Sequence, residues 1–401
     1  MGHTCSEKTR KRSRSPRDGA RKKRSRSKPS VAHEQHGHIK DSDRPHFRWT
    51  RSMSLGPEGR YKVRGHLGDG TFGRVLSAKD RRTGGQVAVK VIKSAEHLRE
   101  LAEEEAEVLW RIQRSDPPKL MQELQSGPDR SALIVRLLDS FLEPDGHFCM
   151  VFEQLGTSLR DFLKRNSARG LYLSDVQVIS RQLLQALATL HLLGFIHTDL
   201  KCRNVMLRHS SHFSAPSPRE PGLATMRPTD CSISLIDFGG CVHQSDDCSR
   251  GRAGTRQFRG PELVLGLDWD SPVDMWAAGC VIYMLYFGKR PFSVHESAEH
   301  LAMMERLTES CFPPWMLQTA QECQDDEASY ELLITEDKKL VWPEGPAGAR
   351  VEALRPLSAQ VLPRHKTFLS FLKGLFQLEP LQRLRATQAH QMEFLTTEVQ
   401  E

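Results

Sequence analysis

The stretch GFIHTDLKCRNVML, residues 194–207, decides how this chain folds and which chemistry it can support. Asp199, Lys201 and Asn204 stand between two apolar, strand-like runs, so the three polar side chains should emerge together from a rigid support. A second apolar run, SLIDFGG at 234–240, ends in Asp237-Phe238-Gly239. One carboxylate can accept a hydroxyl proton, and a second carboxylate with an amide oxygen suits Mg²⁺, which prefers oxygen ligands.

Upstream, residues 61–80 (YKVRGHLGDGTFGRVLSAKD) alternate apolar and polar side chains around Gly68, Gly70 and Gly73, and the alternation resumes at 86–93 after Gly84-Gly85. This alternation predicts strands of an antiparallel sheet. The glycines have the spacing G-x-G-x-x-G, which also occurs in Rossmann folds, but that fold needs a helix directly after the glycines. Because a strand follows here, the pattern favours a hairpin whose backbone N–H groups approach phosphates.

Lys90 lies on an otherwise apolar strand, so its ammonium group needs an anionic partner in a cleft. The next segment predicts a helix with one inward face, made at three- and four-residue spacing by Leu98, Leu101, Glu105, Val108 and Ile112. A carboxylate on such a face is costly unless it is paired. We therefore predict a Lys90–Glu105 ion pair that directs the lysine toward nucleotide phosphates.

The middle of the chain predicts a connection between two lobes. Strands are expected at 131–141 and 147–152, followed by the connector Glu-Gln-Leu-Gly at 153–156. This connector is either a plain loop or a hinge whose backbone groups at Glu153 and Leu155 bind an adenine edge. A helix should then begin at a capping box formed by Ser174 and Gln177 and end at Gly194.

In this order, the glycine hairpin, Lys90, Glu105 and the two aspartate motifs form the motif set of protein kinases. From about 61 to 394 the chain resembles a eukaryotic protein kinase, and within that superfamily the LAMMER, or CDC-like, kinases of the CMGC group. The segment EHLAMMER at 299–306 and threonine in His197-Thr198-Asp199 carry this finer resemblance.

The resemblance implies an α+β, bilobal kinase fold. Residues 61–156 would form the N-lobe and hinge, with an antiparallel sheet and one main helix. Residues 157–395 would form a mostly helical C-lobe, with a family-like insertion at 208–230.

The resemblance also implies the site. Lys90 would contact the α- and β-phosphates with Glu105 as its partner, Asp199 would be the base, and Lys201 would contact the transferring phosphate. Asn204 and Asp237 would bind magnesium, and Glu262 would pair with Arg383. The implied nucleotide loop is Leu67, Gly68, Asp69, Gly70, Thr71, Phe72, Gly73, Arg74 and Val75. The implied adenine pocket is Ala88, the gatekeeper Phe152, Glu153, Leu155, Met206 and Ile236.

Two departures from the family pattern bear on substrates and regulation. The usual Lys-Pro-Glu-Asn is Lys201-Cys202-Arg203-Asn204, and a base near the substrate would weaken binding of arginine-rich peptides. Gly240 replaces the serine after Asp-Phe-Gly, which loosens the start of the activation segment. Within that segment, Ser245, Ser249 and Thr255 are candidate modification sites. Neither departure removes a catalytic group.

Charge divides the chain into a basic tail and a slightly acidic body. Residues 8–28 hold twelve Lys and Arg and one acid, a local charge of 12 − 1 = +11, whereas the rest holds 45 basic and 49 acidic residues, or −4. The tail lacks large apolar residues, so disorder is expected over 1–57. It could carry nuclear import, bind an RNA backbone, or switch charge through phosphorylation of Ser13, Ser15, Ser25 and Ser27, or it could simply be a solvating extension.

Composition excludes several classes of protein. The 401 residues are 38% hydrophobic and 27% charged, which is typical of a globular body, and no apolar run reaches the ~20 residues of a membrane span. Nine scattered cysteines and a charged N-terminus give no sign of a disulfide framework or a secretory signal.

We therefore predict an ATP- and Mg²⁺-dependent dual-specificity kinase, nuclear and with a monomeric catalytic domain, that phosphorylates Arg/Ser-rich splicing factors. The alternatives are a pseudokinase scaffold that binds splicing factors or RNA through its tail, and a plain nucleic-acid-binding protein.

Overall fold

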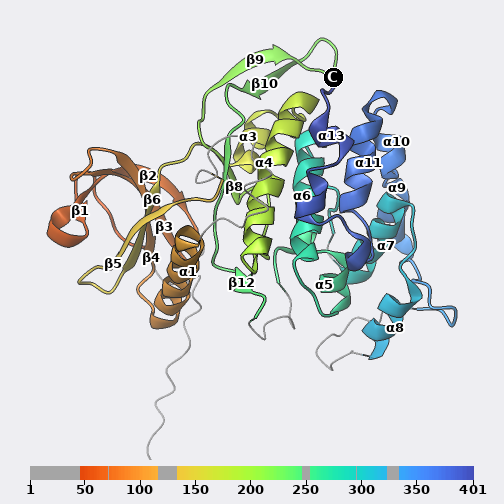
Figure 1. Ribbon diagram of the computed structural model, residues 1–401, viewed down its shortest axis with the longest axis horizontal. Helices are drawn as coiled ribbons and strands as arrows, with labels where there is room; N and C mark the ends of the chain where they lie inside the picture. Colours follow the sequence, from red (N-terminus) through yellow and green to blue (C-terminus); the bar gives the residue numbers. More distant parts are fainter. Residues whose placement is uncertain (1–45, 71, 116–132, 246–252, 295, 323–333) are drawn as a thin grey trace, which may run out of the picture. The chain divides into compact units, whose positions relative to one another are not determined.

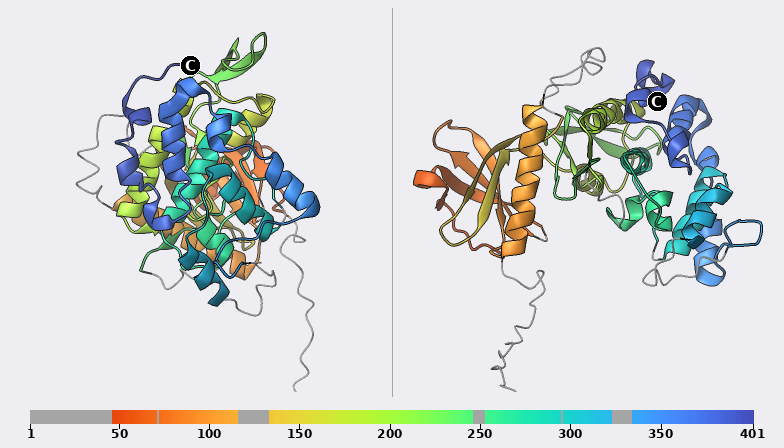
Figure 2. Two further views of the ribbon diagram at one scale, coloured as in Figure 1. Left: turned by 90° about the vertical axis from the view of Figure 1, so that its right-hand side faces the viewer. Right: turned by 60° about the horizontal axis from the view of Figure 1, so that its bottom comes forward.

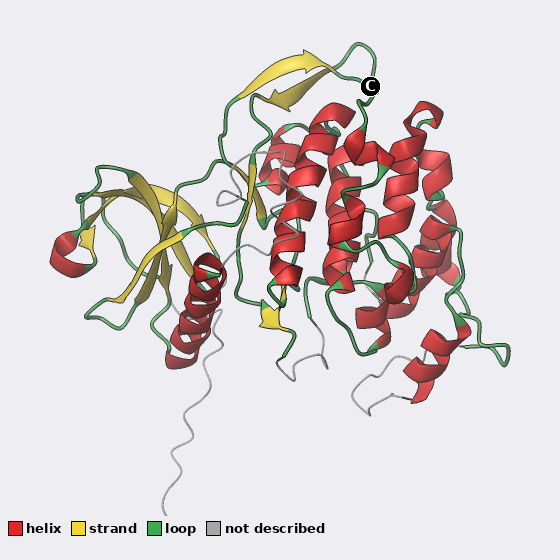
Figure 3. Ribbon diagram, in the orientation of Figure 1, coloured by secondary structure: helices red, strands yellow, loops and turns green. Residues whose placement is uncertain are grey.

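The computed structural model describes residues 46–70, 72–115, 133–245, 253–294, 296–322 and 334–401. These residues belong to one compact unit, 41–401, in which an antiparallel sheet is followed along the chain by a mostly helical part (Figures 1 and 3). The predicted α+β, bilobal organisation is confirmed. Residues 1–45 lie outside the described residues.

The sheet has six strands in the order β1-β2-β3-β4-β6-β5, and every neighbouring pair is antiparallel. The glycine motif falls on the turn between β2 and β3, as the alternating pattern predicts. The strands are β1 Ser54–Leu55, β2 Tyr61–Asp69, β3 Gly73–Asp80, β4 Gln86–Ile92, β5 Leu137–Leu142 and β6 Phe148–Glu153.

Helix α1 (Glu96–Arg114) lies against the sheet and contacts β4, β5 and β6 (Figure 2). Its buried face differs from the predicted one, because Leu101 is 48% exposed and Val108 is only partly buried. At about 100° per residue, Leu101 and Val108 lie roughly 70° and 90° from the centre of the buried stripe. The residues that form this stripe are Leu98, Ala102, Glu105, Ala106, Leu109 and Ile112.

The helical part is built around α6 (Pro272–Phe287), in which every residue from Val273 to Tyr286 is buried. A helix that is apolar all round belongs in a core, and α4 (Leu173–Leu192) and α11 (Lys366–Leu375) pack against it. The remaining α-helices are α3 Leu159–Arg165, α5 Pro261–Leu265, α7 Ser297–Thr308, α8 Pro314–Glu322, α9 Gly345–Ala353, α10 Leu357–Gln360, α12 Ala386–Ala389 and α13 Glu393–Thr396.

The described residues of the helical part contain three two-stranded sheets. They are β7 (Phe195–Ile196) with β12 (Val242–His243), β8 (Val205–Leu207) with β11 (Ile233–Leu235), and β9 (His212–Pro216) with β10 (Ala224–Pro228). Strands β7 and β8 of the first two sheets lie at the two ends of the decisive stretch 194–207, and the third sheet forms a hairpin within the predicted insertion at 208–230.

Three sequence predictions are wrong in their details. The tail does not stay disordered to residue 57, because Phe47 and Leu55 are buried against the sheet. The strand expected at 131–141 begins at Leu137 within the described residues. Ser174 does not cap α4: the helix starts at Leu173, and the Glu401 carboxylate accepts hydrogen bonds from the Leu173 and Ser174 N–H groups.

The described residues contain no helix that is both long and apolar enough to cross a membrane.

Candidate active site

A buried carboxylate on α6 supports the loop that carries Asp199. Asp274 is fully buried and accepts hydrogen bonds from the backbone N–H groups of His197 (2.8 Å) and Thr198 (2.9 Å) and a contact from His191 Nε2 (3.0 Å). Burial alone would raise the pKa of Asp274, but these partners outweigh it and the pKa is lowered. This acid in the first turn of an apolar helix therefore anchors the loop that carries Asp199.

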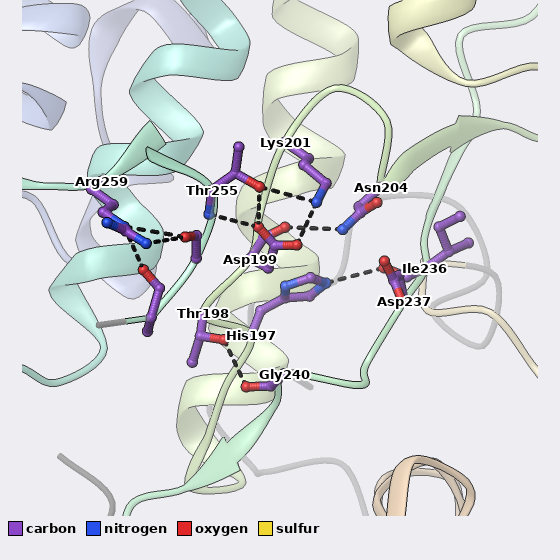
Figure 4. Close-up of polar contacts among 12 residues, drawn as sticks. His197, Thr198, Asp199, Lys201, Asn204, Ile236, Asp237, Gly240, Thr255 and Arg259 are labelled. Atoms are coloured by element: carbon purple, nitrogen blue, oxygen red, sulfur yellow. Dashed lines mark hydrogen bonds and ion pairs between the residues drawn. The ribbon is translucent and has the colours of Figure 1, made fainter. Parts of the chain in front are cut away.

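The predicted residues of this loop lie together. The ammonium of Lys201 contacts the Asp199 carboxylate, and Asn204 Nδ2 donates to the Asp199 carbonyl oxygen at 3.0 Å. Strand β7 ends just before this loop and β8 begins at the residue after Asn204. The loop is thus held at both ends by strands, as the flanking apolar runs predict (Figure 4).

Thr255 completes the loop from a distant segment. Its N–H and its Oγ1 donate to Asp199 Oδ1 at 2.9 and 2.7 Å, and Lys201 Nζ donates to Thr255 Oγ1 at 3.1 Å. Sequence reasoning named Thr255 only as a modification candidate, although its hydroxyl is fully engaged by the catalytic loop. No local pattern marks it, because its partners are more than fifty residues away.

The close approach of the Thr255 segment to the loop that carries Asp199 depends on a glycine and an arginine. Gly254 has φ +70°, and a Cβ there would lie 2.5 Å from the Thr198 carbonyl oxygen. Arg259 donates to the carbonyl oxygens of Ala253 and Gly254 at 2.9–3.1 Å. These contacts hold the backbone that presents Thr255 to Asp199.

The predicted Lys90–Glu105 ion pair is present. Lys90 Nζ lies 2.7 Å from Glu105 Oε2 and 3.9 Å from Asp237 Oδ1. Burial would lower the pKa of Lys90, but the two carboxylates outweigh it and the pKa is raised, so the lysine stays charged. Asp237 adopts the left-handed conformation (φ +68°), and the preceding Ile236 carbonyl contacts His197 Nε2 at 3.1 Å.

A cavity of about 530 Å³ joins these groups. Lys90, Glu105, Asp199 and Asp237 all line it, together with Thr255 and further residues of the sheet, α1 and the activation segment. Four predicted site residues, spread over 147 positions (237 − 90), therefore face one space.

The glycine hairpin contributes Phe72, which lines the cavity and is half exposed like Leu67. At the end of the hairpin, Arg74 Nε lies 2.6 Å from Asp69 Oδ1, and this hydrogen bond holds the pKa of the Asp69 carboxyl well below its usual range. Thr71 lies outside the described residues.

The residues of the predicted adenine pocket are partly exposed, although adjacent residues on the same strands are buried. This holds for Ala88 on β4, Phe152 on β6 and Met206 on β8, and Leu155 and Ile236 are also half-buried. None of the five lines the 530 Å³ cavity, so their nucleotide contacts stay predictions. At the predicted hinge, the Glu153 carboxylate accepts from Arg208 Nη2 at 2.7 Å.

The residues proposed for Mg²⁺ suit a hard cation. Asn204 uses its Nδ2 within the loop, so its Oδ1 remains as a ligand, and the Asp237 side chain is 45% exposed toward solvent. The described residues contain no cluster of three or more His, Cys, Asp or Glu that could hold a metal. A two-oxygen site of this kind would need phosphate oxygens to complete an octahedral shell.

The two departures from the family pattern are structurally accommodated. Cys202 is buried with its Sγ 3.6 Å from Met284 Sδ, whereas Arg203 is exposed. The Gly240 carbonyl oxygen accepts from Thr198 Oγ1 at 2.6 Å. The start of the activation segment is thus tied to the catalytic loop despite the glycine.

The EHLAMMER residues lie on α7, away from the cavity lining. Glu299 pairs with Arg350, and Glu305 accepts from Trp342 Nε1 at 2.7 Å. Both glutamates are buried, so their contacts hold α7 to the segments around it.

Comparisons with known proteins agree with this arrangement. Residues 61–395 match the protein kinase domain family. The chain is 35% identical over 354 residues to the Arabidopsis thaliana serine/threonine-protein kinase AFC1, covering 84% of this chain and 71% of the relative. It is 32% identical over 344 residues to the Mus musculus dual specificity protein kinase CLK2, covering 84% and 64%.

A third relative is the Schizosaccharomyces pombe dual specificity protein kinase lkh1, 31% identical over 361 residues, with 89% of this chain and 49% of the relative covered. Among solved structures, the crystal structure of the PF14_0431 kinase domain matches with a TM-score of 0.76 at 31% identity. The match covers 87% of this chain and 98% of that one.

Proposed function

The chain belongs to the protein kinase domain family and, within it, to the LAMMER, or CDC-like, kinases, and we propose that it transfers the γ-phosphoryl group of ATP to serine, threonine and tyrosine hydroxyls. The observation that carries the proposal is the single cavity lined by Lys90, Glu105, Asp199 and Asp237. Three of these groups are acidic and one is a paired lysine, which is the set that phosphoryl transfer requires.

Each residue has a role that follows from its contacts. Lys90, held by Glu105, opposes the charge of the α- and β-phosphates, and Lys201 opposes the charge of the transferring group. Asp199, fixed by Thr255, orients the attacking hydroxyl and accepts its proton. Catalysis then rests on positioning and charge neutralisation in a preorganised site.

Asn204 and Asp237 would hold Mg²⁺, and the ion would supply positive charge that opposes the charge of the phosphates. The loop supports this role, because Asn204 is oriented by its hydrogen bond to the Asp199 carbonyl.

Arg/Ser-rich splicing factors in the nucleus are the proposed substrates. Support comes from the family and from the chain's own tail, which carries serines next to arginine at Ser13, Ser15, Ser25 and Ser27. The exposed Arg203 opposes this substrate class, so a panel of Arg/Ser and acidic peptides is the direct measurement. A preference for acidic peptides would refute the substrate assignment while leaving the kinase reaction intact.

We predict that Asp199→Asn lowers kcat about 10²- to 10⁴-fold, because the amide can still accept from Thr255 but cannot take up the hydroxyl proton. Lys90→Arg should also be nearly inactive, because a guanidinium cannot reproduce the paired ammonium beside Glu105. Steady-state kinetics on an Arg/Ser peptide measures both effects, and circular dichroism verifies the fold. Wild-type turnover by either variant contradicts the assignment.

The competing function is a pseudokinase scaffold, favoured only by the unusual Cys202-Arg203 and Gly240. Incubation of the full chain with Mg-ATP, followed by mass spectrometry of residues 13–27, separates the two. A kinase of Arg/Ser segments adds phosphate to its own tail, whereas a scaffold leaves the tail unmodified. Binding of RNA by the tail and a monomeric catalytic domain stay predictions.

A further inference from the structure

Residues 46–53, here called the strap, lie along the sheet ahead of the segment that matches the kinase family. Phe47 is buried in the same apolar cluster as Val63 and Leu76. The Ser52 N–H donates to the Val63 carbonyl at 3.0 Å, and the Val63 N–H donates to the Met53 carbonyl at 2.9 Å. The strap is thus fixed to β2, the first strand of the glycine hairpin, by both apolar packing and backbone hydrogen bonds.

The glycine hairpin carries its own cross-strand contact, here called the clasp and made of His66, Asp69 and Arg74. Asp69 and Arg74 lie directly opposite each other where β2 and β3 meet the turn. Arg74 donates twice to the Asp69 carboxylate, from Nε at 2.6 Å and from Nη2 at 3.2 Å. His66 Nε2 lies 3.0 Å from the same carboxylate.

The strap contacts the clasp at two points. Arg74 Nη1 donates to the Phe47 carbonyl oxygen at 3.0 Å, and the Trp49 ring stacks on the His66 ring with centroids 6.4 Å apart and planes 12° apart. Successive side chains on a strand point to opposite faces, so Arg74 and the strap occupy the face of the hairpin opposite Val75. The predicted nucleotide contacts of Val75 are therefore left unobstructed.

The hairpin needs such an external restraint. A Cβ placed on Gly68 would have no heavy atom within 4 Å, and one placed on Gly70 would meet only the Gly73 carbonyl oxygen, at 3.7 Å. Glycine-rich backbone loses much conformational entropy when it is ordered. An exposed ion pair restrains a backbone weakly by itself, but Arg74 here is also bound to a segment anchored in the core through Phe47.

We propose that the strap is a positioning element for nucleoside triphosphate: it holds the clasp, and the clasp holds the glycine hairpin over the phosphates. This inference rests on the proposed function, because it assigns the hairpin to the phosphates of ATP. Trp49, Phe47 and His66 are positioning residues that act through Asp69 and Arg74.

The test compares ATP with adenosine, which lacks phosphates, by calorimetry on the full chain. Trp49→Ala should weaken ATP binding about five-fold and raise the KM for ATP by the same factor, while adenosine binding and kcat stay at wild-type values. Trp49→Phe keeps an aromatic ring against His66 and should restore ATP binding. Trp315→Ala is the matched control, because Trp315 is an exposed tryptophan on α8, outside the cavity lining.

Asp69→Asn tests the same inference from the hairpin side, should Trp49→Ala fail to fold. It should weaken the binding of ATP but not of adenosine. The double variant Trp49→Ala/Asp69→Asn should lose no more ATP affinity than either single variant, because both substitutions break the same connection between the strap and the clasp. Equal losses for ATP and adenosine would show a purely structural role and overturn the proposal, as would unchanged ATP affinity. A wild-type chain that binds ATP without transferring phosphate refutes the proposed function alone.

Discussion

At the scale of single residues, two of the three motif glycines, Gly68 and Gly73, serve different physical needs. Gly73 is required by packing, because a Cβ there would lie 2.4 Å from the Val91 carbonyl oxygen on β4. Gly68 has open space around the position of a Cβ. Its lack of a side chain therefore serves the approach of a ligand rather than the fold.

We predict that Gly73→Ala destabilises the protein by about 1–3 kcal/mol, since the backbone of β3 or β4 must move to relieve the contact. Gly68→Ala should change the free energy of unfolding by less than about 0.5 kcal/mol but raise the KM for ATP. Urea denaturation and steady-state kinetics measure the two quantities. The opposite ranking, with Gly68→Ala the less stable variant, would show that the hairpin is packed differently.

At the scale of elements, a buried ion pair joins α5 to the segment after α11. Arg383 donates to both Glu262 carboxylate oxygens, at 2.6 and 3.0 Å, and to the Pro272 carbonyl at the start of α6. The Arg383 side chain is fully buried and Glu262 is 1% exposed. The predicted Glu262–Arg383 pair is therefore present, and it fixes three elements around the activation segment.

We predict that Glu262→Gln lowers the free energy of unfolding by about 3–5 kcal/mol, because it leaves the Arg383 charge buried without a counter-ion. The matched control is Glu220→Gln, which removes the acid of the exposed Arg169–Glu220 pair and should cost less than about 1 kcal/mol. Equal effects of the two substitutions in chemical denaturation would mean that Arg383 reaches solvent or another acid.

At the scale of the whole molecule, stability depends on histidines that are buried in the helical part. His300 on α7 is almost fully buried, and burial, reinforced by the nearby Arg256 and Arg259, lowers its pKa to about 3. Burial also lowers the pKa values of His365 and His390. The folded protein therefore keeps these rings neutral at pH values where the unfolded chain protonates them, near pH 6.5 and below.

The unfolded state then binds more protons, so the free energy of unfolding falls as the pH drops from about 6.5 toward 3. His300 alone should account for a loss of about 1.4 kcal/mol between pH 7.5 and 5.5. This pH interval lies above the pH range in which carboxylates with lowered pKa values, such as Asp274, change the free energy of unfolding. Urea denaturation at both pH values should show a smaller loss for His300→Leu than for the wild type; identical losses would contradict the assignment.

Local patterns in the sequence, together with the resemblance to protein kinases that their motifs carry, were sufficient for the fold class and for most of the candidate site. Alternation around glycines predicts the hairpin, apolar runs on both sides of Asp199 and Asn204 predict a supported loop, and a charge on an apolar strand requires a partner such as Glu105. These inferences succeed because strand alternation, turn conformations and the cost of burying a charge depend on a few neighbouring residues.

Only the tertiary structure reveals the contacts between segments distant in the chain. Thr255 reaches Asp199, the Asp274 carboxylate supports the catalytic loop, and the Phe47 carbonyl receives Arg74. The buried face of α1 and the Glu401 cap of α4 were likewise mispredicted or missed, because each depends on what packs against the helix. A buried polar group requires a hydrogen-bond partner, and the sequence shows only that such a partner is required. The path of the folded chain determines which distant residue provides it.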